Sequence, residues 1–352
     1  MPKRLALLAV ILTFANLPSA PAQEKQPPPT SQEGVVRRDV DLVSIYFTVR
    51  DNSKRLANDL PHDQFSVSED GRPQPIKFFA HHSDVMLTVG ILLDTGTNMS
   101  WILGEEAQAS SLFVKHVVRP ADLGFILSYA SRVETVQLPT SDVVLLTEQA
   151  HSIENGAAIG LPGHGGPASG GVWFPGGGTV GTNGKKFNKN REAHLYDSAR
   201  VATLRYLKGE VGRKAVVIVA LSGDSQSEST MEDALQTLLE NDVIAYVLQI
   251  HDAPGRDKCD VLHIFEKDTL KKLAEATGGR VLDVRGMDKL EPALDEISDE
   301  LHHQYSLGYY PENKHWDGSF RKVQISVAGK GYTVHARKGY YANQPTENAA
   351  TQ

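Results

Sequence analysis

The sequence predicts an α/β fold in which a doubly wound, mostly parallel sheet is joined to a small β-module built from the two terminal segments. Two apolar runs, VMLTVGILL before Asp94 and AVVIVAL before Ser222, lack the polar alternation of a half-exposed strand. Such runs indicate strands that are buried on both faces. Strands and helices alternate between and after these runs, whereas the flanking segments contain only short strands. This alternation is typical of a parallel sheet covered by helices on both faces.

Residues 1–22 have the pattern of a secretory signal peptide, with a basic start, an apolar run from Leu5 to Ala15 and small residues up to Ala22. The apolar run is too short to span a bilayer, and no later stretch reaches that length. We therefore expect an exported chain, periplasmic or extracellular, without a membrane span in its mature form; a retained anchor is the alternative. Residues 23–35, rich in Pro, Gln and Ser, are expected to form a flexible leader.

Composition narrows the classes of partner. The chain has 352 residues, a formal net charge of −7 and no block of basic residues, which makes it a poor candidate for binding nucleic acid. Cys259 is the only cysteine, so no internal disulfide can form and stability must come from the core.

The two terminal segments, residues 36–82 and residues 304–341, are predicted to form the β-module. In the first segment, Val40–Val49 alternates as a strand does, and two short strands flank Glu69-Asp70-Gly71, which is a hairpin signal. The second segment is predicted to contain three strands separated by turns, at Tyr305–Tyr310, Arg321–Ala328 and Tyr332–Arg337. We hypothesise that the two segments meet in space as one sandwich-like module, and that residues 342–352 form a loose tail.

Residues 85–303 are predicted to form the doubly wound sheet and its helices. Apolar residues at helical spacing and terminal signals indicate the helices; Arg119-Pro120 ends the first, and Ser141-Asp142 begins the second. The expected helices are Trp101–Val118, Ser141–Ile153, Ala193–Lys208, Thr230–Glu240, Lys267–Thr277 and Met287–His303. The expected strands are Val85–Leu93, Leu123–Tyr129, Val133–Leu138 at an edge, Ala215–Leu221, Val243–Ile250 and Arg280–Val284.

Residues 155–190 are rich in glycine and interrupt this region. Ordering a backbone costs on the order of 1–2 kcal/mol per residue, and few apolar side chains are present here to offset that cost. We therefore expect a mobile surface insertion. The functional alternative is a phosphate-binding loop, but the segment contains neither GxxxxGK(S/T) nor GxGxxG between a strand and a helix.

The order of motifs resembles the von Willebrand factor type A fold, specifically the acidobacterial "VWFA-related domain" proteins. The resemblance is carried by the strand ending at Asp94 and by the later motifs HLYDSA, RKAVVIVALSGD, DVIAYVLQI, LKKLAEATGGRV and LHHQYSLGYYPENKHWDGSFRKVQISV. VDLVSIYFTVRDNSKRLANDLPHDQFSVSEDGRPQPIKFF is similar to the amino-terminal part of the same family. The resemblance spans about residues 36–341, and it implies a domain that binds partners at the top of its sheet.

The resemblance also implies a metal-ion-dependent adhesion site, in which a D-x-S-x-S loop, a threonine and a third-loop aspartate hold a divalent cation. Asp94 matches the first acid, but the two serine positions hold Gly96 and Asn98, and the threonine position holds Ala193. The family's Ser-Asp-Gly is replaced by Ser-Gly-Asp, with Asp224 as the acid.

The altered loops leave an incomplete oxygen shell for a hard cation, which favours a chain without a cofactor. The alternative is a degenerate Mg²⁺, Mn²⁺ or Ca²⁺ site. Its candidate ligands are Asp94, Asn98, Ser100 and Asp224.

Histidines and aromatic residues are the other candidate site residues. The adjacent pairs His81-His82 and His302-His303 point to different faces and are expected at a surface or an edge. Tyr305 and Tyr309 share one face of a strand and are expected to pack the β-module. The sequence contains no GxSxG, HExxH or recognisable Cys–His spacing, so nothing identifies a nucleophile.

The sequence thus predicts an exported, non-enzymatic protein-binding or adhesion protein. We define the crest as the loops at Asp94–Ser100, Ala193–His194 and Ser222–Asp224, where a partner is expected to dock. Its candidate contact residues are Thr95, Gly96, Thr97, His194, Ser222 and Gly223. The alternatives are a structural scaffold of the cell envelope with a vestigial metal site and, more weakly, an envelope hydrolase.

Overall fold

A computed structural model describes residues 42–82, 85–95, 111–130, 132–152, 193–220, 223–250 and 260–343. Residues 41–352 form one compact unit. The predicted signal peptide, the leader and the glycine-rich insertion lie outside the described residues.

A six-stranded sheet forms the centre of the α/β core, in the order β10-β9-β8-β5-β6-β7. The strands are β5 (Leu87–Asp94), β6 (Leu123–Tyr129), β7 (Val133–Thr140), β8 (Arg213–Ala220), β9 (Val243–Ile250) and β10 (Val281–Val284). All neighbours pair in parallel except β6 and β7, which are antiparallel at one edge. Numbered along the chain, this is the doubly wound strand order 6-5-4-1-2-3. The predicted fold class is therefore confirmed.

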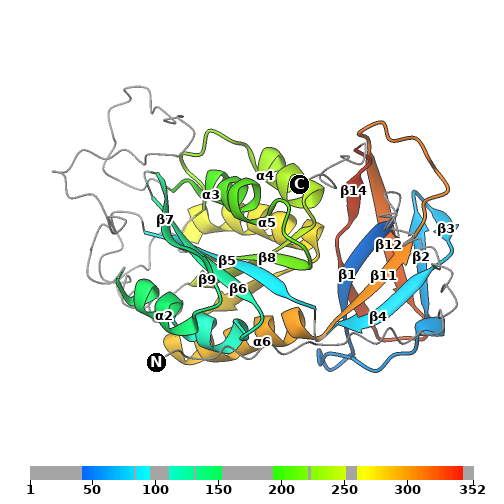
Figure 1. The fold of residues 1–352 in the computed structure, drawn as a ribbon, viewed down its shortest axis with the longest axis horizontal. Helices are drawn as coiled ribbons and strands as arrows, with labels where there is room; N and C mark the ends of the chain where they lie inside the picture. Colours follow the sequence, from blue (N-terminus) through cyan, green and yellow to red (C-terminus); the bar gives the residue numbers. More distant parts are fainter. Residues whose placement is uncertain are drawn as a thin grey trace, which may run out of the picture. The chain divides into compact units, whose positions relative to one another are not determined.

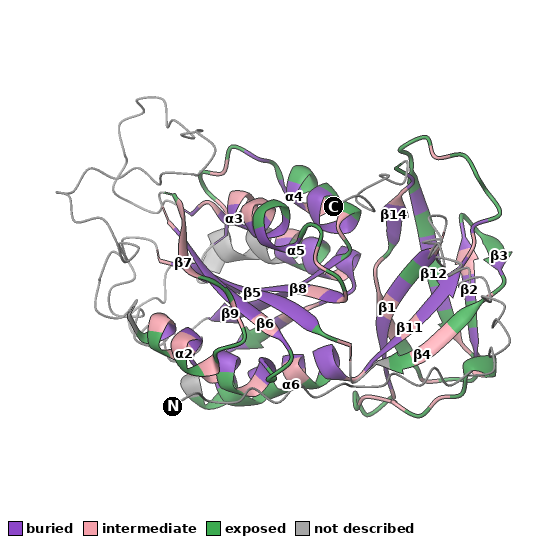
Figure 2. Cartoon of the chain, viewed as in Figure 1, coloured by how far each residue is buried: buried purple, intermediate pink, exposed green. Residues whose placement is uncertain are grey.

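Helices cover both faces of this sheet (Figure 1). One buried cluster contains side chains of α3 (Leu195–Val201), α4 (Met231–Glu240) and α5 (Asp260–Thr277), and the other contains those of α2 (Val143–Ser152), α6 (Leu290–His302) and residues 111–117. Every residue of β5 and of β9 is buried, as expected for strands between two helical layers (Figure 2).

The helix predicted over Ala193–Lys208 is divided in the structure. α3 ends at Val201, and a π-helix follows at Ala202–Leu207. The apolar spacing predicts one continuous helix because the inward-facing residues continue through the π-helical segment. Only the backbone hydrogen-bond partners change there, and the side-chain pattern does not reveal that change. By contrast, α4 begins where the sequence predicts, because Thr230 and Asp233 form a capping box at its first turn.

Two four-stranded sheets form the β-module, in the orders β13-β1-β11-β4 and β14-β12-β2-β3. The first terminal segment supplies β1 (Val43–Arg50), β2 (Phe65–Glu69), β3 (Arg72–Gln74) and β4 (Phe78–His82), with a short 3₁₀ helix at His62–Gln64. The second supplies β11 (Gln304–Tyr309), β12 (Phe320–Val327), β13 (Thr333–Ala336) and β14 (Gly339–Tyr341). Each sheet thus combines strands from both ends of the chain.

The hairpin predicted around Glu69-Asp70-Gly71 is β2–β3, in which Glu69 pairs with Arg72. Asp70 and Gly71 have φ values of 49° and 80°, and two central residues with positive φ are the mark of a type I′ turn. β4 and β14 were not predicted; β4 leaves the hairpin and pairs with β11 in the other sheet.

The first residue of the predicted loose tail, Ala342, is buried and exchanges backbone hydrogen bonds with Gly318 and Ser319. The tail from residue 344 onward lies outside the described residues.

Candidate functional site

The carboxyl ends of β5 and β8, where the crest loops begin, lie at the topological switch point of the sheet. β5 and β8 are neighbours, but the strands that follow them, β6 and β9, lie on opposite sides of this pair. In doubly wound folds, ligands bind at the carboxyl ends of the strands at such a point. Asp94 is the last residue of β5, and its relative exposure is only 1%.

The backbone after Asp94 is tied to β6. Asp94 stands opposite Tyr129, and the amide of Thr95 donates to the Tyr129 carbonyl at 3.0 Å. Leu92, two residues before Asp94, belongs to the core cluster that faces α3, α4 and α5. Because side chains alternate along a strand, Asp94 lies on that same face of the sheet.

Asp224 connects the loop after β8 to the start of α3. Its Oδ1 accepts a hydrogen bond from the Tyr196 amide at 3.1 Å and one from the Ser227 hydroxyl, while its Oδ2 accepts from the Ser227 amide at 3.2 Å. Burial raises the pKa of Asp224, and these hydrogen bonds only partly oppose that rise. Asp224 therefore uses most of its hydrogen-bond acceptor capacity to position the loop after β8 and the start of α3.

Asp197 makes the reciprocal connection from α3 to the same loop. Its carboxylate accepts from the amides of Glu228 at 2.9 Å and Ser229 at 3.1 Å, and the His194 ring lies 3.3 Å away. Burial raises the pKa of Asp197, but the hydrogen bonds from Ser229, Glu228 and His194 outweigh it and leave the pKa below its usual value. Together Asp197 and Asp224 hold residues 223–230 against α3.

Only part of the predicted site can be placed. Asp94, Thr95, His194, Gly223 and Asp224 are described; the other predicted residues, Gly96, Thr97, Asn98, Ser100 and Ser222, lie outside the described residues. His194 is half-buried at the start of α3, where its ring contacts Asp197 and makes no capping hydrogen bond.

Gln249 was not predicted as a site residue. It is the seventh residue of β9, its relative exposure is 5%, and its Oε1 has no hydrogen-bond partner. The available signal was a single amide in the otherwise apolar strand VIAYVLQI.

Of the four candidate metal ligands, only Asp94 and Asp224 are described, and Asp224 already accepts three hydrogen bonds. Among the described residues no group of three His, Cys, Asp or Glu side chains converges as a metal site.

The expectation that His302 lies at a surface or an edge is wrong. Its relative exposure is 1%, and its Nε2 lies 3.3 Å from Asp122, which itself accepts from the Leu87 and Arg119 amides. His302 lies on the inner face of α6 one helical turn after Ser298, and this places it against the sheet.

Ser298, His302 and Asp122 have the composition of a hydrolytic triad but not its geometry. His302 Nδ1 lies 2.8 Å from the Ser298 carbonyl and 3.4 Å from the Ser298 hydroxyl, which donates instead to the His116 carbonyl at 2.7 Å. A nitrogen bonded to a carbonyl carries the proton and cannot accept one from serine. The cluster fastens α6 to the sheet.

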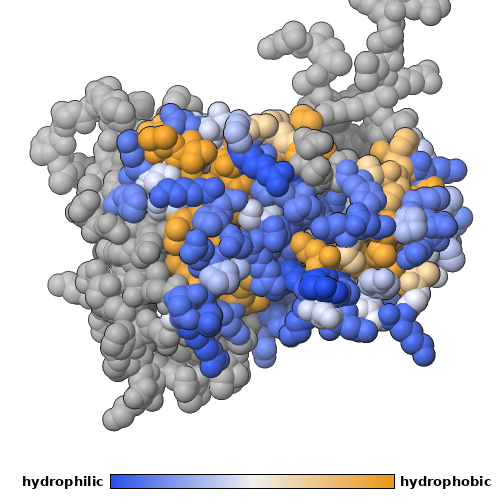
Figure 3. Space-filling model, turned by 90° about the horizontal axis from the view of Figure 1, so that it is seen from below, coloured by the Kyte–Doolittle hydropathy of each residue, from blue (hydrophilic) through white to orange (hydrophobic). Residues whose placement is uncertain are grey.

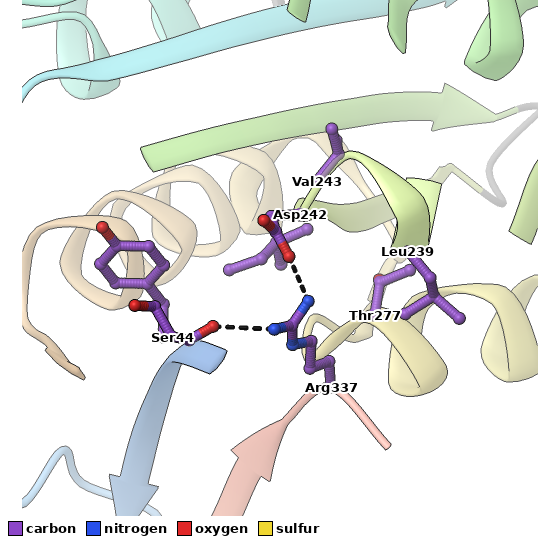
Figure 4. Close-up of a pocket in the computed structure, with 8 residues that line it drawn as sticks. Ser44, Leu239, Asp242, Val243, Thr277 and Arg337 are labelled. Atoms are coloured by element: carbon purple, nitrogen blue, oxygen red, sulfur yellow. Dashed lines mark hydrogen bonds and ion pairs between the residues drawn. The ribbon is translucent and has the colours of Figure 1, made fainter. Parts of the chain in front are cut away.

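A pocket lies at the amino end of β9, where the β-module meets the α/β core (Figure 4). Arg337 occupies its centre, with one guanidinium nitrogen ion-paired to Asp242 and another donating to the Ser44 carbonyl at 2.8 Å. The other lining residues are Tyr46, Leu239, Val243, Ile244 and Thr277. Because two guanidinium nitrogens of Arg337 contact residues of the core and of β1, we assign this pocket to the contact between module and core.

The face of the molecule seen in Figure 3 shows separate hydrophobic groups divided by hydrophilic residues. The described residues of this face therefore do not form one continuous apolar surface. Within the described part of the chain, no helix is both long enough and apolar enough to cross a membrane.

Comparison with protein-family models gives no match, and comparison with curated protein sequences gives none. Solved structures similar to this chain include a von Willebrand factor type A protein from Catenulispora acidiphila, with 12% identity and a TM-score of 0.44 over 87% of this chain and 74% of that one. Another is the vWF domain of the type V pili tip protein Mfa5 from Porphyromonas gingivalis, with 8% identity and a TM-score of 0.42 over 62% of this chain and 95% of that one.

Proximal thread matrix protein 1 from the mussel byssus is similar with 14% identity and a TM-score of 0.43, over 63% of this chain. This chain spans about half the length of that protein, 50%. Another structure of the byssus protein has a zinc-occupied MIDAS motif. These likenesses concern the fold, and none of them assigns a ligand or a partner to this chain.

Proposed function

We propose that this chain is an exported, non-enzymatic protein whose crest binds a partner protein, as in adhesion. The observation that carries the proposal is the position of Asp94, the last residue of β5 at the switch point of the sheet. A carboxylate at this point suits ligand binding, because it stands where doubly wound folds receive their ligands.

The construction of the neighbouring loop supports the same function. Asp197 and Asp224 fix residues 223–230 to α3 through hydrogen bonds to backbone amides. A loop held in one conformation loses little entropy when a partner binds, which favours affinity. Asp197 and Asp224 therefore hold this loop in one conformation in the absence of a partner.

The proposal is tested by site-specific photo-crosslinking. A photoreactive amino acid replaces Thr95 or His194 at the crest and, as a control, Val211, which is exposed and precedes β8 at the opposite end of the sheet. The variants are exposed to cell-envelope and culture-medium proteins and irradiated. We expect a discrete cross-linked species from the crest positions only, and its loss when Asp94→Ala is added.

Equal cross-linking from Val211, or crest cross-linking that survives Asp94→Ala, would contradict this use of the crest. A crest without cross-links in a protein that stays in the envelope would favour the scaffold alternative. The hydrolase alternative is tested separately by an ester, peptide and glycoside hydrolysis screen. Hydrolysis that disappears in Asp94→Ala would replace the binding function with an enzymatic one.

A further inference from the structure

The pocket at the module–core contact has the form of a small-molecule site. Arg337 lies at its centre (Figure 4), and its rim carries the exposed residues Ser44 and Asp242. Its floor consists of buried side chains of the core, those of Leu239, Val243, Ile244 and Thr277. The pocket therefore combines a largely apolar floor with a few polar groups at a boundary between two parts of the chain, as ligand sites commonly do.

Arg337 retains a hydrogen-bond donor that the protein does not use. Two of its guanidinium nitrogens contact Asp242 and the Ser44 carbonyl, but its Nε is buried and has no hydrogen-bond partner. The side chain of Asp242 is 54% exposed, and ion pairs of exposed carboxylates contribute little stability. A ligand carboxylate can therefore replace Asp242 at low cost and accept charge-assisted hydrogen bonds from the guanidinium.

Capping of the neighbouring helices does not account for Arg337. α4 and α5 both end at the pocket, and a cation can stabilise the carboxyl end of a helix. Carbonyls of both last turns already have partners, however. The Thr237 carbonyl accepts from the Asn241 side chain at 2.8 Å, and the Ala276 carbonyl accepts from the Lys338 amide at 2.9 Å. The guanidinium of Arg337 is directed instead to the rim of the pocket.

Lys214 adds a second positive charge beside the pocket. It stands opposite Val243 in the β8–β9 pair and is half-buried, and burial lowers its pKa. The charges of Asp242 and Glu210 oppose this effect and that of Arg337 adds to it, so these groups lie within electrostatic reach of the ammonium. Of the two carboxylates only Asp242 lines the pocket, and both cations share it. In a chain with a net charge of −7, this local balance favours an anionic ligand.

We propose that this pocket binds a small carboxylate with a short apolar tail. The carboxylate takes the place of Asp242 beside Arg337, with Lys214 nearby, and the tail lies on the apolar floor. The site is at the amino end of β9, whereas the crest is at the carboxyl ends of the strands, so this inference does not depend on the proposed function. Because Ser44, Tyr46 and Arg337 belong to the β-module and the floor belongs to the core, the bound ligand also links the two parts.

The test is a titration of the exported full-length protein with isobutyrate, followed by saturation-transfer difference NMR of the ligand methyl groups. A ligand of about six non-hydrogen atoms should bind with a Kd on the order of 1 mM. Isobutyramide has the same shape without the charge and should bind at least about tenfold more weakly. N-acetylglycylvaline carries the same group at a chain terminus. Tighter binding of this peptide than of isobutyrate would assign the carboxylate to a protein terminus, and weaker binding would assign it to a free acid.

Asp242→Asn distinguishes a ligand site from a structural ion pair. Asparagine tolerates the φ of 56° at this position as well as aspartate does, so the fold is preserved. The substitution removes the competitor for Arg337, and isobutyrate should therefore bind about fivefold more tightly. Lys214→Gln removes a cation and should weaken binding about threefold. Asp288→Asn, at an exposed aspartate paired with Lys289, is the matched control and should leave binding unchanged.

Three results would overturn the proposal. Binding that Asp242→Asn weakens or leaves unchanged would show that the ligand does not replace this carboxylate. Equal binding of isobutyrate and isobutyramide would show that the charge is not recognised. No methyl signal from wild type or Asp242→Asn at ~100 mM isobutyrate, about a hundred times the expected Kd, would remove the site itself. The cross-linking experiment at the crest still decides the proposed function in each case.

Discussion

Glu69 shows how one buried residue joins the two halves of the β-module. Its Oε2 accepts hydrogen bonds from the hydroxyls of Tyr309 and Tyr340, both at 2.8 Å, and its Oε1 lies 3.5 Å from the Arg321 guanidinium. Burial, reinforced by the charge of Glu69, raises the pKa of both tyrosines. The carboxylate on β2 thus links β11, β12 and β14.

Replacing Glu69 by alanine should destabilise the protein by about 3–5 kcal/mol, because it leaves the buried Arg321 without its counter-charge. Glu69→Gln keeps the shape and one acceptor and should cost less. Urea unfolding at pH 7 measures the free energy of unfolding of both variants. Lys322→Ala, at an exposed neighbour of Arg321, is the control and should stay within about 0.5 kcal/mol of wild type. A Glu69→Ala variant as stable as this control would show that the cluster is not a structural link.

At the scale of elements, α3 and residues 223–230 stabilise each other through carboxylates and not through apolar packing alone. Asp197 contacts Glu228 and Ser229 from the helix, while Asp224 contacts Tyr196 from the loop. The ring of His194 lies beside Asp197 on the same side. The conformation of the described crest residues therefore depends on Asp197 and Asp224.

The lowered pKa of Asp197 predicts a pH dependence. A carboxyl whose pKa is lowered in the folded state contributes stability above its unfolded value, 3.8, and that contribution is lost as pH falls through the folded value. Asp197→Asn should therefore be about 1–2 kcal/mol less stable than wild type at pH 7, and the gap should close below pH 3.8. Urea midpoints measured from pH 7 downward check this. Glu228→Gln, at an exposed residue of the loop, should show no such gap; a gap constant with pH would contradict the assignment to ionised Asp197.

At the scale of the whole molecule, the β-module and the α/β core meet through charged groups. Glu300 of α6 is 1% exposed and lies between Arg50 of β1, with Nε at 3.0 Å, and Arg280, with Nε at 2.7 Å. Glu296 completes the cluster by pairing with both arginines. Breaking a buried pair leaves an uncompensated charge, so the cluster couples the two parts strongly.

His335 makes this contact sensitive to acid. It stands opposite Thr48 in the β1–β13 pair, and the charges that act on it are those of Glu300, Arg280, Arg50 and Glu275. Burial lowers the pKa of His335 below its usual 6.5, so the stability it contributes is present above pH 6.5 and is lost as pH falls toward the folded value.

Wild type should therefore lose stability between pH 7 and pH 5, and His335→Gln should lose less over the same range. Amide hydrogen exchange at β1, β13 and α6 locates the loss, which should concentrate at the contact. His303→Gln, a histidine outside this cluster at the end of α6, is the control. Equal pH dependence in all three proteins would exclude His335 as the cause.

Local patterns in the sequence determined the elements that depend on neighbouring residues. The apolar runs predicted β5 and β8, the alternation of strands and helices predicted the doubly wound sheet, and Asp70-Gly71 predicted the turn of the β2–β3 hairpin. Asp94 was placed at the end of its strand because periodicity shows where an apolar run stops. These features follow from interactions within one strand, helix or turn.

Tertiary structure alone decided which distant residues meet. Glu69 contacts Tyr309 across 240 positions, and Asp224 contacts the start of α3. His302 was expected at an edge but is buried, because the residue that receives it, Asp122, lies far away in the sequence. Periodicity encodes which face of an element is apolar but not the partner of that face, since the partner is selected by packing and burial across the whole chain.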